Sequence, residues 1–182
     1  MASNTISEDG TILRDARSRY RNRAQDGAHG AFEVETRASG KTPRAEVTIS
    51  RVQAPDDVAE LGGGDVVVRA RRMFSDDRLV QLCDTYIPNF VVEAAPAVAE
   101  QDTGQGGIIN RMADAGLAQT KVVEDVTLRS ATTAQAEAFG VDEGKDLLTI
   151  THTGLTEDGR VVEVSVHTLA PGWTLRYDVP LS

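Results

Sequence analysis

Two segments of alternating apolar and polar residues, joined by a short polar turn, constrain the fold of this chain most strongly. They occupy residues 145–169 and flank Glu157-Asp158-Gly159-Arg160. Alternation with a period of two is typical of β-strands, and a short glycine-containing polar stretch between two such strands is typical of a hairpin turn. The pattern therefore predicts an antiparallel hairpin with one polar and one apolar face.

The register of this hairpin decides which side chains lie together, because antiparallel partners share a face. If Glu157 pairs with Arg160, the facing pairs are Thr156 with Val161, Gly154 with Glu163, His152 with Ser165, and Ile150 with His167. One face then carries His152, Glu163, Ser165 and His167, and the other carries Leu155, Val162, Val164 and Val166. A shift by one residue would send every side chain to the opposite face.

The polar face of the hairpin has three possible interpretations. A carboxylate flanked by imidazoles could bind a hydroxylated or amine-bearing ligand, or two histidines and one glutamate could hold a metal ion. The same residues could also form a strand face that is simply open to water. We favour the ligand pocket and expect no metal or other cofactor, because side chains at alternate strand positions converge only approximately.

Composition narrows the class of protein. The formal net charge is −9, and residues 1–30 contain five arginines against four acidic residues, so the acidic excess lies entirely in the remainder. Such a surface would repel nucleic-acid phosphates, so residues 31–182 are not expected to contact DNA.

Cys83 is the only cysteine, which excludes an intramolecular disulfide. No 18-residue apolar run or signal-peptide pattern is present, and we expect a cytoplasmic protein.

The remaining patterns predict an α+β domain with short helices covering one face of a mostly antiparallel sheet. Residues 1–28 are predicted to be an Arg-rich tail or linker that becomes helical around Arg14–Arg23, and residues 29–182 one domain. Residues 89–107 are predicted to be a mobile connection around a brief helical turn. The predicted helices are Phe32–Ser39, Pro55–Leu61, Ile108–Ala115 and one that Thr132 caps and Gly140 ends. The further predicted strands are Ala45–Gln53, Val66–Phe74, Leu79–Ile87, Lys121–Leu128 and Thr174–Val179.

A second predicted hairpin, around Ser75-Asp76-Asp77-Arg78, carries a cluster of arginines. In its simplest register Arg69 faces Asp84 and Arg71 faces Leu82, while Arg72 points to the other face. Arg69 and Asp84 would then form a cross-strand ion pair. Alternatively, one arginine stays free to bind an anionic ligand, since its planar guanidinium suits carboxylate or phosphate.

Two further observations bear on function. Gly30-Ala31-Phe32 precedes a short helix, and the first amides of a helix bind anions readily. No motif of a hydrolase, a zinc protease, a P-loop protein or a dinucleotide-binding enzyme is present. We therefore expect no catalytic residues and no enzyme activity.

The order of these pieces resembles the UTRA effector-binding domain of GntR-type transcription regulators of the HutC branch, whose fold is similar to that of chorismate lyase. The resemblance covers about residues 28–180. The stretches that carry it are Gly30–Phe32, Gly40–Arg44, Val68–Arg71, Asp84–Pro88, Arg129–Thr132, Gly159–Ser165 and Arg176-Tyr177. No single stretch is decisive, but their order and spacing together are fairly specific.

The resemblance implies a dimer that senses a small molecule and thereby controls DNA binding by a winged-helix domain. By matching position, Ala31 and Phe32 would offer backbone amides, Arg71 would hold an anionic group, and Glu163 would hydrogen-bond hydroxyls or amides. The ligand-binding residues that we predict are Ala31, Phe32, Arg69, Arg71, Asp84, His152, Glu163, Ser165 and His167.

The chain departs from the family pattern at several positions. Met73 stands where many members have another arginine, Cys83 replaces a polar residue, and His152 stands where arginine is common. These departures weigh against a phosphosugar effector. Only a linker-like piece precedes the sensor, so we expect the chain to be either a truncated piece of a regulator or a sensor-only protein. In both cases we expect that it does not bind an operator by itself. The alternatives are a small lyase-like enzyme on the same fold and a dimerisation module without a ligand.

Overall fold

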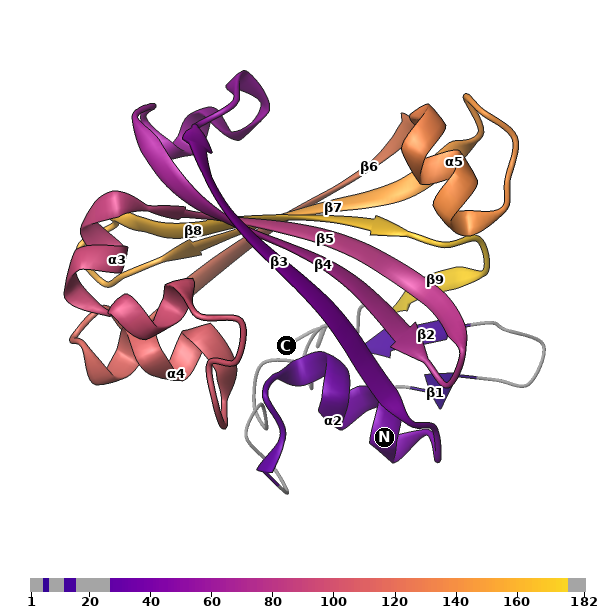
Figure 1. The fold of residues 1–182 in the computed structure, drawn as a ribbon, viewed down its shortest axis with the longest axis horizontal. Coiled ribbons are helices and arrows are strands. Elements are labelled where there is room, and N and C mark those ends of the chain that lie inside the picture. Colours follow the sequence, from indigo (N-terminus) through magenta and orange to yellow (C-terminus); the bar gives the residue numbers. More distant parts are fainter. Residues whose placement is uncertain (1–4, 7–11, 16–26, 177–182) are drawn as a thin grey trace, which may run out of the picture.

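The computed structural model describes residues 5–6, 12–15 and 27–176, and its main feature is a twisted six-stranded sheet (Figure 1). Every neighbouring pair in this sheet is antiparallel, and the strand order is β3-β4-β5-β8-β7-β6. The strands are β3 (Pro43–Gln53), β4 (Asp65–Ser75), β5 (Arg78–Pro88), β6 (Lys121–Ser130), β7 (Asp146–Leu155) and β8 (Val161–Leu169). The predicted α+β class is confirmed.

Short helices pack on both faces of the sheet, and not on one face as predicted (Figure 1). In the view of Figure 1, α2 (Ala31–Ala38) and α4 (Gly107–Asp114) lie below the sheet, while α5 (Thr133–Phe139) lies above it. The capping box predicted at the start of α5 is present: Thr132 Oγ1 accepts from Gln135 N at 3.3 Å, and Thr132 N donates to Gln135 Oε1 at 3.0 Å. A 3₁₀ segment, η2 (Asp56–Leu61), forms where a helix was predicted.

Residues 89–107 are more regular than predicted. They contain α3 (Asn89–Ala94) and the 3₁₀ turn η3 (Pro96–Ala99). Val91 and Val98 of these two elements are fully buried and pack with Val67 and Ile87 of the sheet in the main hydrophobic core. This apolar spacing, interrupted by proline, builds two short helices that cover the sheet where only a brief helical turn was predicted, whereas residues 100–106 form an irregular connection.

The hairpin of β7 and β8 has the predicted register over most of its length. Gly154 faces Glu163, His152 faces Ser165, and Ile150 faces His167. Next to the turn, Leu155 rather than Thr156 faces Val161, because the ladder shifts by one residue beyond Gly154. The turn pairing thus differs from the prediction, and this bulge restores the predicted pairing at the polar positions.

The hairpin of β4 and β5 differs from prediction by one residue. A register shift between Met73 and Phe74 leaves Arg71 facing Cys83, Arg69 facing Thr85, and Asp84 facing Ala70. A β-bulge puts two residues of one strand against one of its partner, so every pair beyond it is offset. The predicted pairing of Arg69 with Asp84, and of Arg71 with Leu82, was therefore wrong.

A small second sheet joins the N-terminal segment to the end of the chain. Its strands are β1 (Thr5–Ile6), β2 (Ile12–Asp15) and β9 (Trp173–Arg176), and β2 runs parallel to β9. Arg14 and Asp15 thus belong to a strand, not to the helix predicted around Arg14–Arg23, and the rest of that helix lies outside the described residues. The predicted strand Thr174–Val179 corresponds to β9, and its last three residues also lie outside them.

Within the described part of the chain, no helix has both the length and the apolar character needed to cross a membrane.

Candidate functional site

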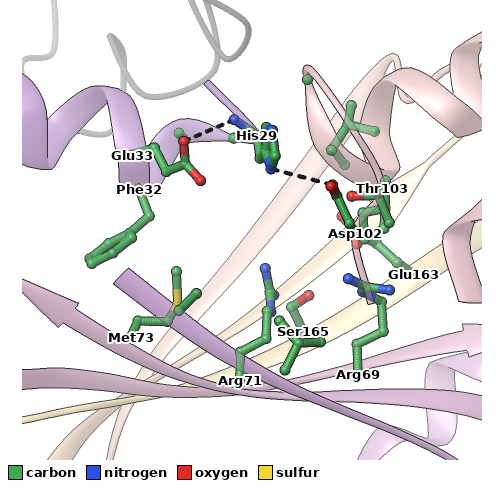
Figure 2. A pocket seen from close by; sticks show the side chains of 18 of the residues that line it. His29, Phe32, Glu33, Arg69, Arg71, Met73, Asp102, Thr103, Glu163 and Ser165 are labelled. Carbon is green, nitrogen blue, oxygen red and sulfur yellow. Dashed lines mark hydrogen bonds and ion pairs between the residues drawn. The ribbon is translucent and has the colours of Figure 1, made fainter. Parts of the chain in front are cut away.

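A cavity of about 500 Å³ lies between the sheet, the start of α2 and the segment that leads into α4 (Figure 2). This volume is within the range of about 300–1,000 Å³ that is usual for small-molecule sites. Strands β3, β4, β7 and β8 form the floor of the cavity, and Phe32, Met73 and Ile108 contribute apolar side chains to its lining. The predicted site residues that line it are Ala31, Phe32, Arg69, Arg71, His152, Glu163, Ser165 and His167.

Arg71 points from β4 into this cavity (Figure 2). Its Nη2 donates to Thr85 Oγ1 at 2.6 Å and to Cys83 Sγ at 2.8 Å, which fixes the orientation of the guanidinium. Its Nε is buried and has no hydrogen-bond partner among the described residues. A buried donor without an acceptor costs about 1–3 kcal/mol, so an acceptor on a ligand would be favoured here.

Arg69, two residues earlier on the same face, has a different role. It is only 4% exposed, and its guanidinium donates to the carbonyl oxygens of Val98 at 2.9 Å, of Gln101 at 3.2 Å, and of Glu100. Burial, followed by the nearby Arg71 charge, lowers the pKa of Arg69 to about 10. The predicted ion pair with Asp84 is replaced by these backbone contacts, which hold the segment after η3 against the sheet.

The second polar region of the cavity centres on Glu163, which is 3% exposed. Glu163 Oε1 accepts from Gln119 Nε2 at 2.7 Å and lies 3.4 Å from His152 Nε2. The other ring nitrogen of His152 lies 3.4 Å from Glu124 Oε1. The imidazole is thus held between two carboxylates, an arrangement that favours its charged form.

The charges in this region shift two pKa values in opposite directions. Burial acts to lower the pKa of His152, but the hydrogen bonds that its ring donates to Glu124 and Glu163, and the charges of these carboxylates, outweigh it, so the pKa lies above its usual value. Burial acts to raise the pKa of Glu163, but His152, Gln119 and the Arg71 charge outweigh it, so the pKa lies below its usual value. Near neutral pH, these shifts favour a buried, hydrogen-bonded ion pair.

Glycine at position 154 makes room for the Gln119 side chain. A Cβ atom on Gly154 would come within 2.5 Å of Gln119 Nε2. Gly154 lies opposite Glu163 in the β7–β8 ladder. Gln119 can therefore reach over β7 to Glu163 only because this strand position has no side chain.

Between the two polar regions, hydroxyl and amide groups connect β4, β5 and β8. Ser165 Oγ and Thr85 Oγ1 are 2.7 Å apart, and His167 Nδ1 is 2.9 Å from Gln81 Nε2. Thr85 also accepts from Arg71. The Ser165 hydroxyl therefore extends the hydrogen-bond network that orients Arg71. Its contact is with the Thr85 hydroxyl, and not with a histidine that could act as a base.

The start of α2 forms the wall opposite the sheet. Ala31 and Phe32 line the cavity there, and Phe32 packs against Met73, Cys83 and Trp173. The first amides of an α-helix have no intrahelical partner, so they are oriented to receive an acceptor. Together with Arg71 they make one end of the cavity suited to an anionic group.

Asp84 is the one predicted site residue that does not line the cavity. It is exposed on the opposite face of the sheet because the bulge in the β4–β5 hairpin moves it out of line with Arg69. Sequence reasoning also missed residues that shape the site: Thr85, Gln119, Glu124, and the segment 101–107. Only the glycines at 104, 106 and 107 gave a signal for that segment.

In the residues that the structure describes, no group of three or more His, Cys, Asp or Glu side chains is arranged to hold a metal ion. The cavity instead offers a guanidinium donor and helix amides at one end and a paired carboxylate at the other. This arrangement suits a small polar ligand that carries an anionic or accepting group and a donating group.

Comparison with solved structures supports the fold assignment. A protein described as a GntR-family transcriptional regulator has a TM-score of 0.77 at 20% identity, over 100% of this chain and 71% of that one. PhnF from Mycobacterium smegmatis has a TM-score of 0.74 at 16% identity, over 95% of this chain and 73% of that one. The ligand-binding domain of a regulator from Bordetella bronchiseptica, described as GntR-family, has a TM-score of 0.60 at 18% identity, over 77% of this chain and 91% of that one.

At these identities the solved structures establish the shared fold alone. A search of curated proteins finds no match. The family comparison is decisive, because the UTRA domain model matches residues 38–171, which is most of the chain and includes the whole sheet. The chain therefore belongs to the UTRA domain family.

Proposed function

We propose that this protein senses a small-molecule effector as part of a GntR-type transcription regulator of the HutC branch. Residues 29–182 would form the effector-binding domain, and effector binding would control a winged-helix DNA-binding domain in a homodimer. Such a regulator would act in the bacterial cytoplasm without a cofactor. The family assignment and the fold shared with regulators of this type support the proposal.

The observation that carries this proposal is the buried Nε of Arg71 beside a cavity of about 500 Å³. Thr85 and Cys83 use the other end of the guanidinium, so its charge is oriented but not neutralised by a carboxylate in ion-pair contact among the described residues. An effector with a carboxylate or phosphate could meet Arg71 and the amides of Ala31 and Phe32. We therefore propose an anionic effector.

Glu163 indicates what the rest of the effector would carry. Its Oε1 already accepts from Gln119 and contacts His152. A carboxylate has four lone-pair positions, so its second oxygen can accept from a hydroxyl, an amine or an amide N–H of a ligand. The cavity's carboxylate Glu163 is thus paired with His152 and Gln119, an arrangement that supports ligand binding more than acid–base catalysis.

A thermal-shift screen of metabolites tests this proposal, with Arg71→Ala and Glu163→Ala as site variants. Arg72→Ala is the matched control, because Arg72 lies next in the same strand but is exposed and pairs with Glu46. A ligand at 100 times its Kd stabilises the folded state by about 2.7 kcal/mol. We expect a ligand that stabilises the wild type and Arg72→Ala, is not turned over, and binds both site variants more weakly.

Four outcomes would contradict parts of the proposal. Unchanged affinity in both site variants would show that the ligand binds elsewhere, and turnover of the ligand would favour an enzyme. A chain that stays monomeric in sedimentation velocity at micromolar concentration would contradict the homodimer. Absence of any stabilising ligand across metabolite classes would favour a dimerisation module.

A further inference from the structure

The segment of residues 101–107, which we call the strap, crosses the side of the cavity opposite the sheet. Gln101, Asp102, Thr103, Gly106 and Gly107 from this segment all line the cavity. Figure 2 shows Asp102 and Thr103 above the sheet residues Arg71 and Glu163, on the side opposite Phe32. An occupant of the cavity would therefore lie between the sheet and the strap.

Arg69 anchors the start of the strap to the sheet. Its guanidinium donates to the carbonyl oxygens of Val98, Glu100 and Gln101, and Gln101 Nε2 donates to Val47 O of β3 at 3.3 Å. Carbonyl groups on three residues are thus bound by one side chain that is itself buried. A buried cation that makes several charge-assisted hydrogen bonds holds its partners more firmly than an exposed one.

The end of the strap is fastened to the residues that precede α2. Gly106 N donates to Ala28 O at 2.9 Å, and Ala28 is fully buried. Gly107 approaches so closely that a Cβ atom there would collide with the His29 carbonyl oxygen. His29 Nδ1 and Asp102 Oδ1 are also 3.5 Å apart, but both side chains are well exposed, so this contact contributes little.

We propose that the strap and residues 28–33 move as one unit that closes the cavity and transmits its occupancy to the N-terminal segment. Arg69 is then a positioning residue, which acts through the strap and does not touch the ligand. Ligand entry would require the strap and residues 28–33 to lift together. Because residues 28–33 continue directly from the N-terminal segment and carry the Ala31 and Phe32 amides, such a movement would alter how that segment leaves the domain.

The regulatory part of this inference rests on the proposed function, whereas the mechanical part can be tested without any ligand. Gly107→Ala should break the contact with His29, and Gly104→Ala is a matched control. Both glycines have a positive φ, 67° for Gly107 and 71° for Gly104, so both substitutions strain the backbone. A Cβ on Gly104 would meet only Arg111 Nη1, at 3.9 Å.

Hydrogen exchange of the whole chain, followed by mass spectrometry, measures the opening of the strap and of the segment around residues 28–33 in the same experiment. We expect Gly107→Ala to accelerate exchange about tenfold in residues 27–36 and in residues 101–108 together, since amides in one cooperative unit open together. Gly104→Ala should accelerate exchange in residues 101–108 alone. Amides of β5 should stay unchanged in both variants, which would exclude global unfolding.

Arg69→Lys provides a second, independent perturbation. A lysine ammonium is a compact point charge and cannot reproduce the fork that reaches three carbonyl groups. We expect it to accelerate exchange in the same two segments. If both Gly107→Ala and Arg69→Lys affect residues 101–108 while residues 27–36 stay as in the wild type, the inference is overturned. That result would not contradict the proposed ligand site, and a failed ligand screen would not contradict the coupling between the strap and residues 28–33.

Discussion

Replacing Glu163 with glutamine should reveal how far the buried ion pair stabilises the fold. Glu163 is 3% exposed, accepts from Gln119 at 2.7 Å and lies 3.4 Å from His152. Hydrogen bonds to charged groups contribute about 1.5–3 kcal/mol each, and the glutamine can still accept from Gln119. We therefore expect Glu163→Gln to lower the free energy of unfolding by about 2 kcal/mol at pH 6.

The loss should depend on pH with a sign that the two pKa shifts determine. The pKa of His152 is raised above 6.5, so its contribution is full below that value and disappears as the pH rises through the folded-state pKa. The pKa of Glu163 is lowered below 4.5, so its contribution is full above that value and disappears as the pH falls through the folded-state pKa. Between these values both are present, and at pH 8.5 the effect of Glu163→Gln should be clearly smaller.

Urea unfolding at pH 6 and pH 8.5 measures this difference, with fluorescence of Trp173, the only tryptophan of the chain, as the signal. An NMR titration of the His152 ring should show a lower pKa in the variant. Ser165→Ala is the control: it removes a buried hydroxyl and its 2.7 Å contact with Thr85 but no charge, so its cost should not change with pH. Equal losses at both pH values for Glu163→Gln, or an unchanged pKa of His152, would refute the reasoning.

Three further substitutions test other parts of the structure. Thr132→Ala should lower the free energy of unfolding by about 1 kcal/mol, because it removes the capping box with Gln135, and an unchanged urea midpoint would contradict this. Gly154→Ala should cost about 1–3 kcal/mol and shift the NMR signals of Gln119, which it would displace; an unperturbed Gln119 amide would show that the contact is not tight. Leu128→Ser should change stability by less than about 0.5 kcal/mol, since Leu128 is 67% exposed, and a larger loss in urea unfolding would indicate that this side chain is covered.

The polar face of the β7–β8 hairpin could be predicted from sequence because its information is local. Alternation alone puts Glu163, Ser165 and His167 on one face of their strand. The predicted turn pairing was off by one residue, and the bulge between Gly154 and Leu155 compensates for it, so that His152 pairs with Ser165. His152, Glu163, Ser165 and His167 therefore share a face as predicted. That this face is enclosed depends on α2 and residues 101–109, which the pattern of the hairpin alone cannot place.

The β4–β5 hairpin shows where such reasoning fails. The same rule applied there put Asp84 beside Arg69, but one bulge at Met73 and Phe74 moved Asp84 to the exposed face. A bulge leaves the alternation on each side intact, so the sequence pattern has no feature that marks it. The roles of Arg69 and Gln119 were equally hidden, because both depend on contacts with segments distant in sequence.

A crystal structure with an effector obtained from the thermal-shift screen would test the central claim most directly, because it locates the ligand relative to Arg71. The account predicts a ligand in the cavity with an acceptor about 2.7–3.2 Å from Arg71 Nε, a buried donor that has no hydrogen-bond partner among the described residues. A ligand bound outside the cavity, or one inside it that leaves this nitrogen without an acceptor, would contradict the account.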